Sequence, residues 1–143
     1  MSNTEQSLQI PWQGIHHIAL NTADLDATIR FYRDVLGMQI SDIAPSQGGR
    51  GRHCLIFFKR KDDDICGFHF FERPIEKTTL GASDIHALSF VPHVALQLPD
   101  ETSANALRER LSHAQVSITD IPQLGSFVFF DNNHLCLEVS RLA

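Results

Sequence analysis

The 143-residue chain lacks the sequence features of membrane-spanning, secreted and cysteine-bound zinc proteins. It has no apolar run long enough to span a bilayer, and its first nine residues lack the basic start and apolar stretch of a signal peptide. Its three cysteines are an odd number and show no C-x-x-C spacing, so a thiolate zinc site is not supported. This pattern predicts free thiols in a cytoplasmic protein that does not bind membranes.

Positive charge is also scarce. The 12 lysines and arginines are outnumbered by 17 acidic residues, which gives a formal net charge of -5 and argues against a nucleic-acid surface. The basic residues between Arg50 and Lys61 are followed at once by three aspartates, so they predict a solvated hairpin end. With 43% hydrophobic and 20% charged residues, the chain has the composition of one ordinary globular domain.

The chain does contain an internal repeat. The run that starts at His17 (His-Ile-Ala-Leu) recurs at His93 (His-Val-Ala-Leu), and Asp24 recurs as Asp100, at an offset of 76 residues. In both copies an alternating strand pattern leads into a helical pattern, and more strand patterns follow. The sequence therefore predicts two modules, each with the order strand, helix, strand, strand, strand.

The boundaries of these modules follow from the turn signals. We expect one domain over residues 1–143, with module one at about 13–73, a connection at 74–91 and module two at about 92–141. Strands are predicted at 15–21, 39–44, 53–59, 65–72, 93–98, 116–120, 127–130 and 135–140. One helix is expected from Asp24 to a stop at Gly37, and the other from Asp100 to about His113.

Strand parity indicates which side chains share a face. His17 and Ala19 alternate with the apolar Ile18 and Leu20, and the strand that starts at His93 repeats this alternation. The apolar faces should pack on the helices. The opposite faces, which carry a histidine and a small alanine, are therefore predicted to line a cleft.

The fourth strand of each module adds another polar position to the cleft. Glu138 interrupts an apolar strand, where burial without a partner would cost free energy. His69 holds the matching place in module one, because residues 67–70 and 136–139 follow their turns equivalently. A regular strand cannot turn both His69 and Glu72 into the cleft, so we expect His69 there unless a bulge intervenes.

Two imidazoles and a carboxylate suffice to bind a divalent metal ion. His17, His93 and Glu138 are therefore the predicted metal ligands, and His69 is either a fourth ligand or an acid–base group. Each also has an ordinary interpretation, as a strand histidine satisfied by one hydrogen bond or as a glutamate paired with an arginine. The other histidines are interpreted as structural or surface residues: His16, His53, His86, His113 and His134.

Three stretches carry a resemblance to a known family. They are residues 15–20 (Ile-His-His-Ile-Ala-Leu), residues 31–38 with a Phe-Tyr-x-x-x-Leu-Gly core, and residues 129–138, which end in Leu-Glu. They resemble the vicinal oxygen chelate superfamily of glyoxalase, bleomycin resistance and dioxygenase proteins, over about residues 15–140. The resemblance implies an α+β fold in which two βαβββ modules form a curved, incomplete barrel, and it implies a homodimer.

The resemblance also implies a function. Family ligands fall at His17, His69, His93 and Glu138, where Fe, Zn, Mn or Ni would chelate two neighbouring oxygens of a small-molecule substrate. His69 and Glu138 are the implied catalytic residues.

The branch of the family stays open. Glyoxalase I proteins carry Glu at the place of His69, and ring-cleaving dioxygenases usually have a tyrosine near the metal, whereas the only tyrosine here is Tyr32 in the first helix. Lyase or isomerase chemistry and dioxygenase chemistry are both retained. The alternative is a non-catalytic protein of the bleomycin-resistance type that binds a small molecule without a metal.

Overall fold

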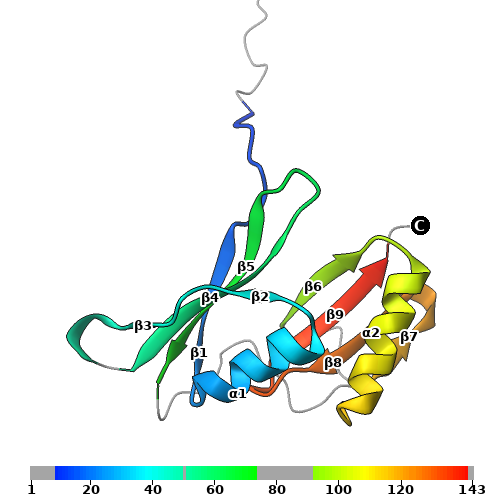
Figure 1. Cartoon of the computed structure of the whole chain (residues 1–143). Helices are drawn as coiled ribbons and strands as arrows, with labels where there is room; N and C mark the ends of the chain where they lie inside the picture. The colour runs from blue at the N-terminus through cyan, green and yellow to red at the C-terminus, as the bar shows by residue number, and fades with distance from the viewer. Residues whose placement is uncertain (1–8, 50, 74–91, 142–143) are drawn as a thin grey trace, which may run out of the picture.

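The computed structural model describes residues 9–49, 51–73 and 92–141. The predicted connection at 74–91 lies outside the described residues. Figure 1 shows two separate sheets, one for each half of the chain, with a helix beside each. Within the described ranges, no helix is long and apolar enough to cross a membrane.

Module one forms the first sheet. Its elements are β1 (His17–Thr22), α1 (Leu25–Ile29) with a π-helical turn (Arg30–Val35), β2 (Gln39–Ile40), β3 (Ala44–Pro45), a 3₁₀ turn (Gln47–Gly49), β4 (Arg52–Lys59) and β5 (Ile65–Glu72). The strand order is β1-β5-β4-β2, with β3 also on β4, and β1 lies parallel to β5.

The predicted strand at 39–44 is instead split into β2 and β3. The Ser41 hydroxyl, in place of a backbone carbonyl, accepts the Leu55 N–H at 2.8 Å, which interrupts the regular ladder.

Module two forms the second sheet. Its elements are β6 (His93–Leu98), α2 (Glu101–His113), β7 (Thr119–Ile121), a 3₁₀ turn (Pro122–Leu124), β8 (Ser126–Phe130) and β9 (Cys136–Arg141). The order is β6-β9-β8-β7, and β6 lies parallel to β9. The strand predicted at 116–120 starts three residues later, because the Val116 N–H still donates to the Leu111 carbonyl at the helix end.

The two sheets therefore repeat one topology, in which the first and last strands of each module lie side by side. This confirms the predicted α+β fold of two βαβββ modules in an open, incomplete barrel. The helix starts also repeat. The Asp24 carboxylate accepts the Ala27 N–H at 2.9 Å, and the Asp100 carboxylate accepts the Ser103 N–H at 2.8 Å. Gly37, at φ 73°, ends the first helical segment in the left-handed conformation.

One apolar core joins both modules. Tyr32 lies fully buried within it, with its ring centroid 5.4 Å from that of Phe68 and 5.3 Å from that of Phe70. Its other main members from the two sheets and α2 are Leu20, Ile56, Leu111, Phe127, Phe129, Leu137 and Val139. The apolar strand faces thus pack inward, as parity predicts, which leaves the histidine-bearing faces on the other side.

A polar contact between the modules lies at the edge of this core. The Tyr32 hydroxyl donates to the Asp131 carboxylate at 2.6 Å in the turn between β8 and β9. In the same turn the Asn133 side chain accepts from the Thr22 hydroxyl at 2.7 Å and donates to the Thr28 hydroxyl at 3.1 Å. We call these five residues the module junction. Burial raises the pKa of Asp131, although its hydrogen bonds oppose that shift.

Candidate functional site

Strand register places the predicted site residues at matching positions in the two sheets. Ala19 pairs with His69 in the first sheet, and the equivalent alanine of β6 pairs with Glu138 in the second. His17 and His93 lie two residues before these alanines and share their faces. The structure thus makes His69 and Glu138 equivalent in the repeat.

Glu72 faces the opposite way. β5 keeps an unbroken register with both neighbouring strands, so no bulge reverses its parity. The Glu72 carboxylate accepts the Leu25 N–H at 3.0 Å at the start of α1, and it pairs with the Arg52 guanidinium at 2.9 Å. The hydrogen bonds from Arg52, followed by that from Leu25, hold the pKa of Glu72 below its usual range. Glu72 therefore supports the helix start, and His69 lies on the face that it shares with His17.

One face of module one carries His17, His53 and His69, and His16, just before β1, contacts His17; we call these four residues the imidazole cluster. The ring centroids of His17 and His69 are 5.7 Å apart. His53 Nδ1 lies 2.8 Å from His69 Nε2, and His16 Nδ1 lies 2.8 Å from His17 Nδ1. In each of these two hydrogen bonds one ring donates its N–H and the other accepts, as the tautomers dictate. The four rings therefore form a chain of contacts rather than isolated side chains.

Phe71 holds two of these rings in place. The His69 ring stacks on it at 4.3 Å with an interplanar angle of 26°, and the His53 ring at 5.2 Å and 16°. Burial, and then the neighbouring His53 and His17, lower the pKa of His69. His69 is therefore a neutral imidazole at neutral pH, held flat against an aromatic ring.

Module two carries a simpler pair. His93 Nε2 lies 3.6 Å from the Glu138 carboxylate, whose side chain is only 16% exposed. The two residues come from the neighbouring strands β6 and β9, two positions apart in register. Cys136 shares this face but is buried, and its burial raises the pKa of its thiol. The group available for chemistry is thus the imidazole–carboxylate pair.

These two groups do not meet within one chain. Among residues 9–49, 51–73 and 92–141, no three His, Cys, Asp or Glu side chains are placed so that they could hold one metal ion. The structure brings His17 next to His69, and His93 next to Glu138, but it keeps the pairs apart. We call the first pair the first half-site and the second pair the second half-site.

The donors of the two half-sites together fit a divalent ion. His17 and His93 offer imidazole nitrogens and Glu138 offers a carboxylate, and this set suits Fe(II) or zinc. Nδ1 of His17 is hydrogen-bonded to Nδ1 of His16, and in the tautomer in which His17 is the donor its Nε2 keeps a lone pair that could bind a metal. Metal-bound histidines usually have such an outer contact, which fixes the orientation of the ring.

The sequence allowed His53 to line the cleft from the third strand but grouped it with the structural or surface residues, so its contact with His69 was not predicted. The signal was available in the hairpin that joins β4 and β5. Lys59 pairs with Ile65 across a short turn, and counting back along both strands puts His53 opposite Phe71 and diagonal to His69.

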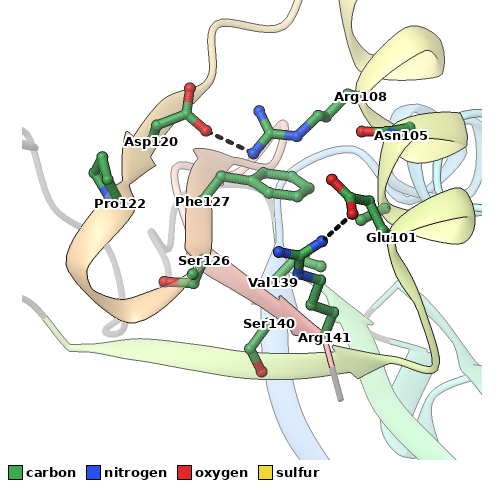
Figure 2. Close-up of a pocket in the computed structure, with 12 residues that line it drawn as sticks. Glu101, Asn105, Arg108, Asp120, Pro122, Ser126, Phe127, Val139, Ser140 and Arg141 are labelled. Atoms are coloured by element: carbon green, nitrogen blue, oxygen red, sulfur yellow. Dashed lines mark hydrogen bonds and ion pairs between the residues drawn. The ribbon is translucent and has the colours of Figure 1, made fainter. Parts of the chain in front are cut away.

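A separate hollow of about 380 Å³ lies between α2 and the second sheet, and Figure 2 shows its lining. Arg108 pairs with Asp120 and lies over the Phe127 ring at 4.2 Å, while Arg141 pairs with Glu101 at 2.8 Å. Each arginine is thus already neutralised by a carboxylate. We assign this hollow a structural role, in which ion pairs tie α2 to the sheet.

A larger apolar groove of about 880 Å³ runs between the first sheet and β6. Ile18 and Phe68 line one side, and Val94 and Leu96 line the other. β1 and β6 are edge strands of their sheets, so each has one backbone edge without a neighbouring strand of its own sheet. The groove thus offers an apolar surface between the first sheet and β6, next to the open edges of β1 and β6.

One family model matches most of the chain. The family model described as Glyoxalase/Bleomycin resistance protein/Dioxygenase superfamily matches residues 14–137. No curated protein matches the chain significantly in sequence.

Solved structures show the same fold at low sequence identity. The fosfomycin resistance protein FosX from Mesorhizobium loti is 15% identical with a TM-score of 0.64, over 90% of this chain and 91% of that one. A possible glyoxalase from Bacillus cereus is 16% identical with a TM-score of 0.61, over 90% and 99%. A glyoxylase/bleomycin resistance protein/dioxygenase domain from Frankia sp. EAN1pec is 19% identical with a TM-score of 0.64, over 90% and 96%.

Proposed function

Because the chain belongs to the glyoxalase/bleomycin resistance protein/dioxygenase superfamily, we propose that it is a metalloenzyme acting on a small substrate with two neighbouring oxygens. One observation carries the proposal. His93 and Glu138 lie 3.6 Å apart on a cleft face whose counterpart in module one presents His17 at the repeat-equivalent position. These three donors make up a two-histidine, one-carboxylate set.

His17, His93 and Glu138 would hold the ion. When bound there, a divalent metal polarises a carbonyl and stabilises a negatively charged oxygen. The chain itself supplies a proton acceptor. His69 lies beside His17, and its lowered pKa leaves the ring neutral at the pH where a base must accept a proton.

We place the complete site between two copies of the chain. Within one chain the described residues keep the half-sites apart, so His17 of one copy would meet the partner copy's second half-site. The apolar groove and the open edges of β1 and β6 supply surface for this contact. A two-fold dimer assembled in this way contains two identical sites.

Among the reactions of the superfamily, we favour lyase or isomerase chemistry. Ring-cleaving dioxygenases usually need a tyrosine near the metal, and Tyr32 is fully buried in the core with its hydroxyl bound to Asp131. It therefore cannot reach a substrate. The paired imidazoles of His53 and His69 instead supply groups suited to moving a proton.

A cytoplasmic location fits the thiols. The cysteines Cys54, Cys66 and Cys136 are all free. Disulfides are rare in the reducing cytoplasm, so this state is the ordinary one there.

Metal analysis of protein purified without chelators tests the proposal. We expect about one divalent ion per chain and loss of that ion when His17 and His93 are both replaced by alanine. His113→Ala is the matched control, because His113 is an exposed histidine at the end of α2. A folded protein that binds no divalent metal would instead favour a metal-free binding protein, for which the aromatic stack on Phe71 would serve as a binding wall.

A further inference from the structure

The proposed function uses the bond between His53 and His69 only for proton movement, but the same bond also bears on metal coordination. His69 Nε2 lies 2.8 Å from His53 Nδ1, and both rings stack on Phe71. The stacking fixes the planes of both imidazoles. The hydrogen bond then fixes which nitrogen of His69 faces His53.

This contact limits what His69 can do at a metal. A neutral imidazole has one N–H donor and one acceptor nitrogen, and a metal needs a nitrogen lone pair. Nε2 of His69 is engaged by His53, and Nδ1 is the nitrogen nearer the backbone. Coordination through Nε2 would require the His53 bond to break.

The second module supplies an internal comparison. Register makes Glu138 the counterpart of His69, because each pairs with the alanine of its module's first strand. By the same register Ser126 is the counterpart of His53. The buried Ser126 hydroxyl has no hydrogen-bond partner among the described residues, so it does not restrain Glu138 as His53 restrains His69.

We propose that His53 withholds His69 from the metal, so that the site has three protein ligands and keeps its remaining positions open for substrate. The inference rests on the proposed function, since it presumes a metal at His17, His93 and Glu138. His53 acts here as a positioning residue. Its effect on ligand number matters because a site must keep open positions if it is to chelate two substrate oxygens.

Titration with Co²⁺, followed by visible absorption, tests this without a substrate. His53→Phe keeps an aromatic ring on Phe71 but removes the nitrogen that binds His69. We expect it to bind Co²⁺ about tenfold or more tighter than the wild type, with a changed visible spectrum, because His69 becomes a fourth protein ligand. His69→Gln alone should leave the Co²⁺ affinity within about twofold of wild type.

The double variant His53→Phe/His69→Gln completes the cycle. It should return both the affinity and the spectrum to those of the wild type, since the gain acts through His69. His113→Phe is the control for the loss of one histidine at an exposed site. Circular dichroism of every variant checks that a change in binding does not come from a loss of fold.

The outcomes separate this inference from the proposed function. Absence of Co²⁺ binding by the wild type would overturn both. Wild-type binding that His53→Phe leaves unchanged would overturn this inference alone, as would His69→Gln weakening Co²⁺ as much as His17→Ala does. If His53→Phe does not fold, ¹⁵N spectra of the zinc-loaded wild type decide, because the His17 ring nitrogen should shift on metal binding and His69 Nε2 should not.

Discussion

The two modules share a backbone plan but differ in what they present. Each starts its helix with an aspartate cap and pairs its first and last strands in parallel. Module one, however, presents a cluster of imidazoles, whereas module two presents an imidazole with a carboxylate. Repetition has thus preserved positions and not chemistry. A two-histidine, one-carboxylate set requires one face of each kind.

Mixing two defective copies gives the sharpest test of this division. His17→Ala damages the first half-site and Glu138→Gln damages the second, so each variant alone should lose nearly all bound metal. A mixed dimer of the two variants contains one site with both defects and one site with neither. We expect the purified mixed dimer to hold about half of the wild-type metal content, and the unfractionated mixture about a quarter, as measured by elemental analysis.

Separate tags on the two copies allow the mixed dimer to be purified, and each variant mixed with itself is the control. If the site lay within a single chain, mixing would restore no metal.

The next largest effect is a loss of unfolding free energy at the residues that pair with His17 and His93. His17 pairs with Gly67, and His93 pairs with Cys136. A Cβ at Gly67 would collide with the Ile56 carbonyl of β4, so Gly67→Ala should cost about 2–3 kcal/mol of unfolding free energy. Cys136→Ala, at the equivalent position, should cost about 1 kcal/mol. Urea unfolding measures both variants, and equal costs would show that the two sheets are equally tolerant here.

The last strand of each module provides a third contrast. Glu72 binds the start of α1 directly, whereas its counterpart Arg141 reaches α2 through Glu101. Glu72→Gln should cost about 1 kcal/mol at pH 7, and Glu101→Gln about 0.5 kcal/mol or less, because the latter pair is exposed. Thermal or urea unfolding of both variants at neutral pH checks the difference.

The free-energy cost of Glu72→Gln should depend on pH, and the direction of that dependence follows from the pKa of Glu72. The pKa of Glu72 is lower in the folded protein than in the unfolded chain. The carboxylate therefore adds its full stability above its unfolded pKa of about 4.3, and this contribution disappears as the pH falls through the folded pKa. The wild type and Glu72→Gln should converge in acid, while a gap that widened in acid would contradict this assignment.

The smallest effect is expected at the hollow of Figure 2. Asp120→Asn removes the charge that pairs with Arg108 on the surface of module two, and it should change the unfolding free energy by less than about 0.5 kcal/mol. Arg108→Ala should cost about 1 kcal/mol, because it also removes the contact with the Phe127 ring. A larger loss for Asp120→Asn would mean that the ion pair, and not the ring contact, fastens α2.

Much of the fold followed from local patterns in the sequence. Alternation placed His17 and His93 on their faces, and aspartates marked both helix starts, because these rules act within a few residues. The split of the 39–44 strand was not predicted, since it depends on one serine hydroxyl bonding across to Leu55. The connection at 74–91 stays an expectation.

The site was less accessible to sequence reasoning. Parity predicted which of His69 and Glu72 shares a face with His17, but it could not predict that the half-sites stay apart within one chain. That separation depends on how the sheets pack, which is decided by contacts between residues about a hundred positions apart, such as Tyr32 with Asp131. The contact between His53 and His69 could be predicted only from the register of the hairpin formed by β4 and β5, and strand patterns alone do not give that register.

The module junction makes the two halves of the chain depend on each other. The buried Tyr32 hydroxyl of the first half donates to Asp131 of the second, and two threonines of the first half also bond to asparagines of the second, Thr22 to Asn133 and Thr28 to Asn132 and Asn133. Splitting the halves would remove the acceptor of the Tyr32 hydroxyl, whereas Thr22 and Thr28 would keep their bonds to each other and to the Asp24 carbonyl. The two halves therefore depend on each other at this point, and a change at Tyr32 or Asp131 leaves the distant partner without its hydrogen bond.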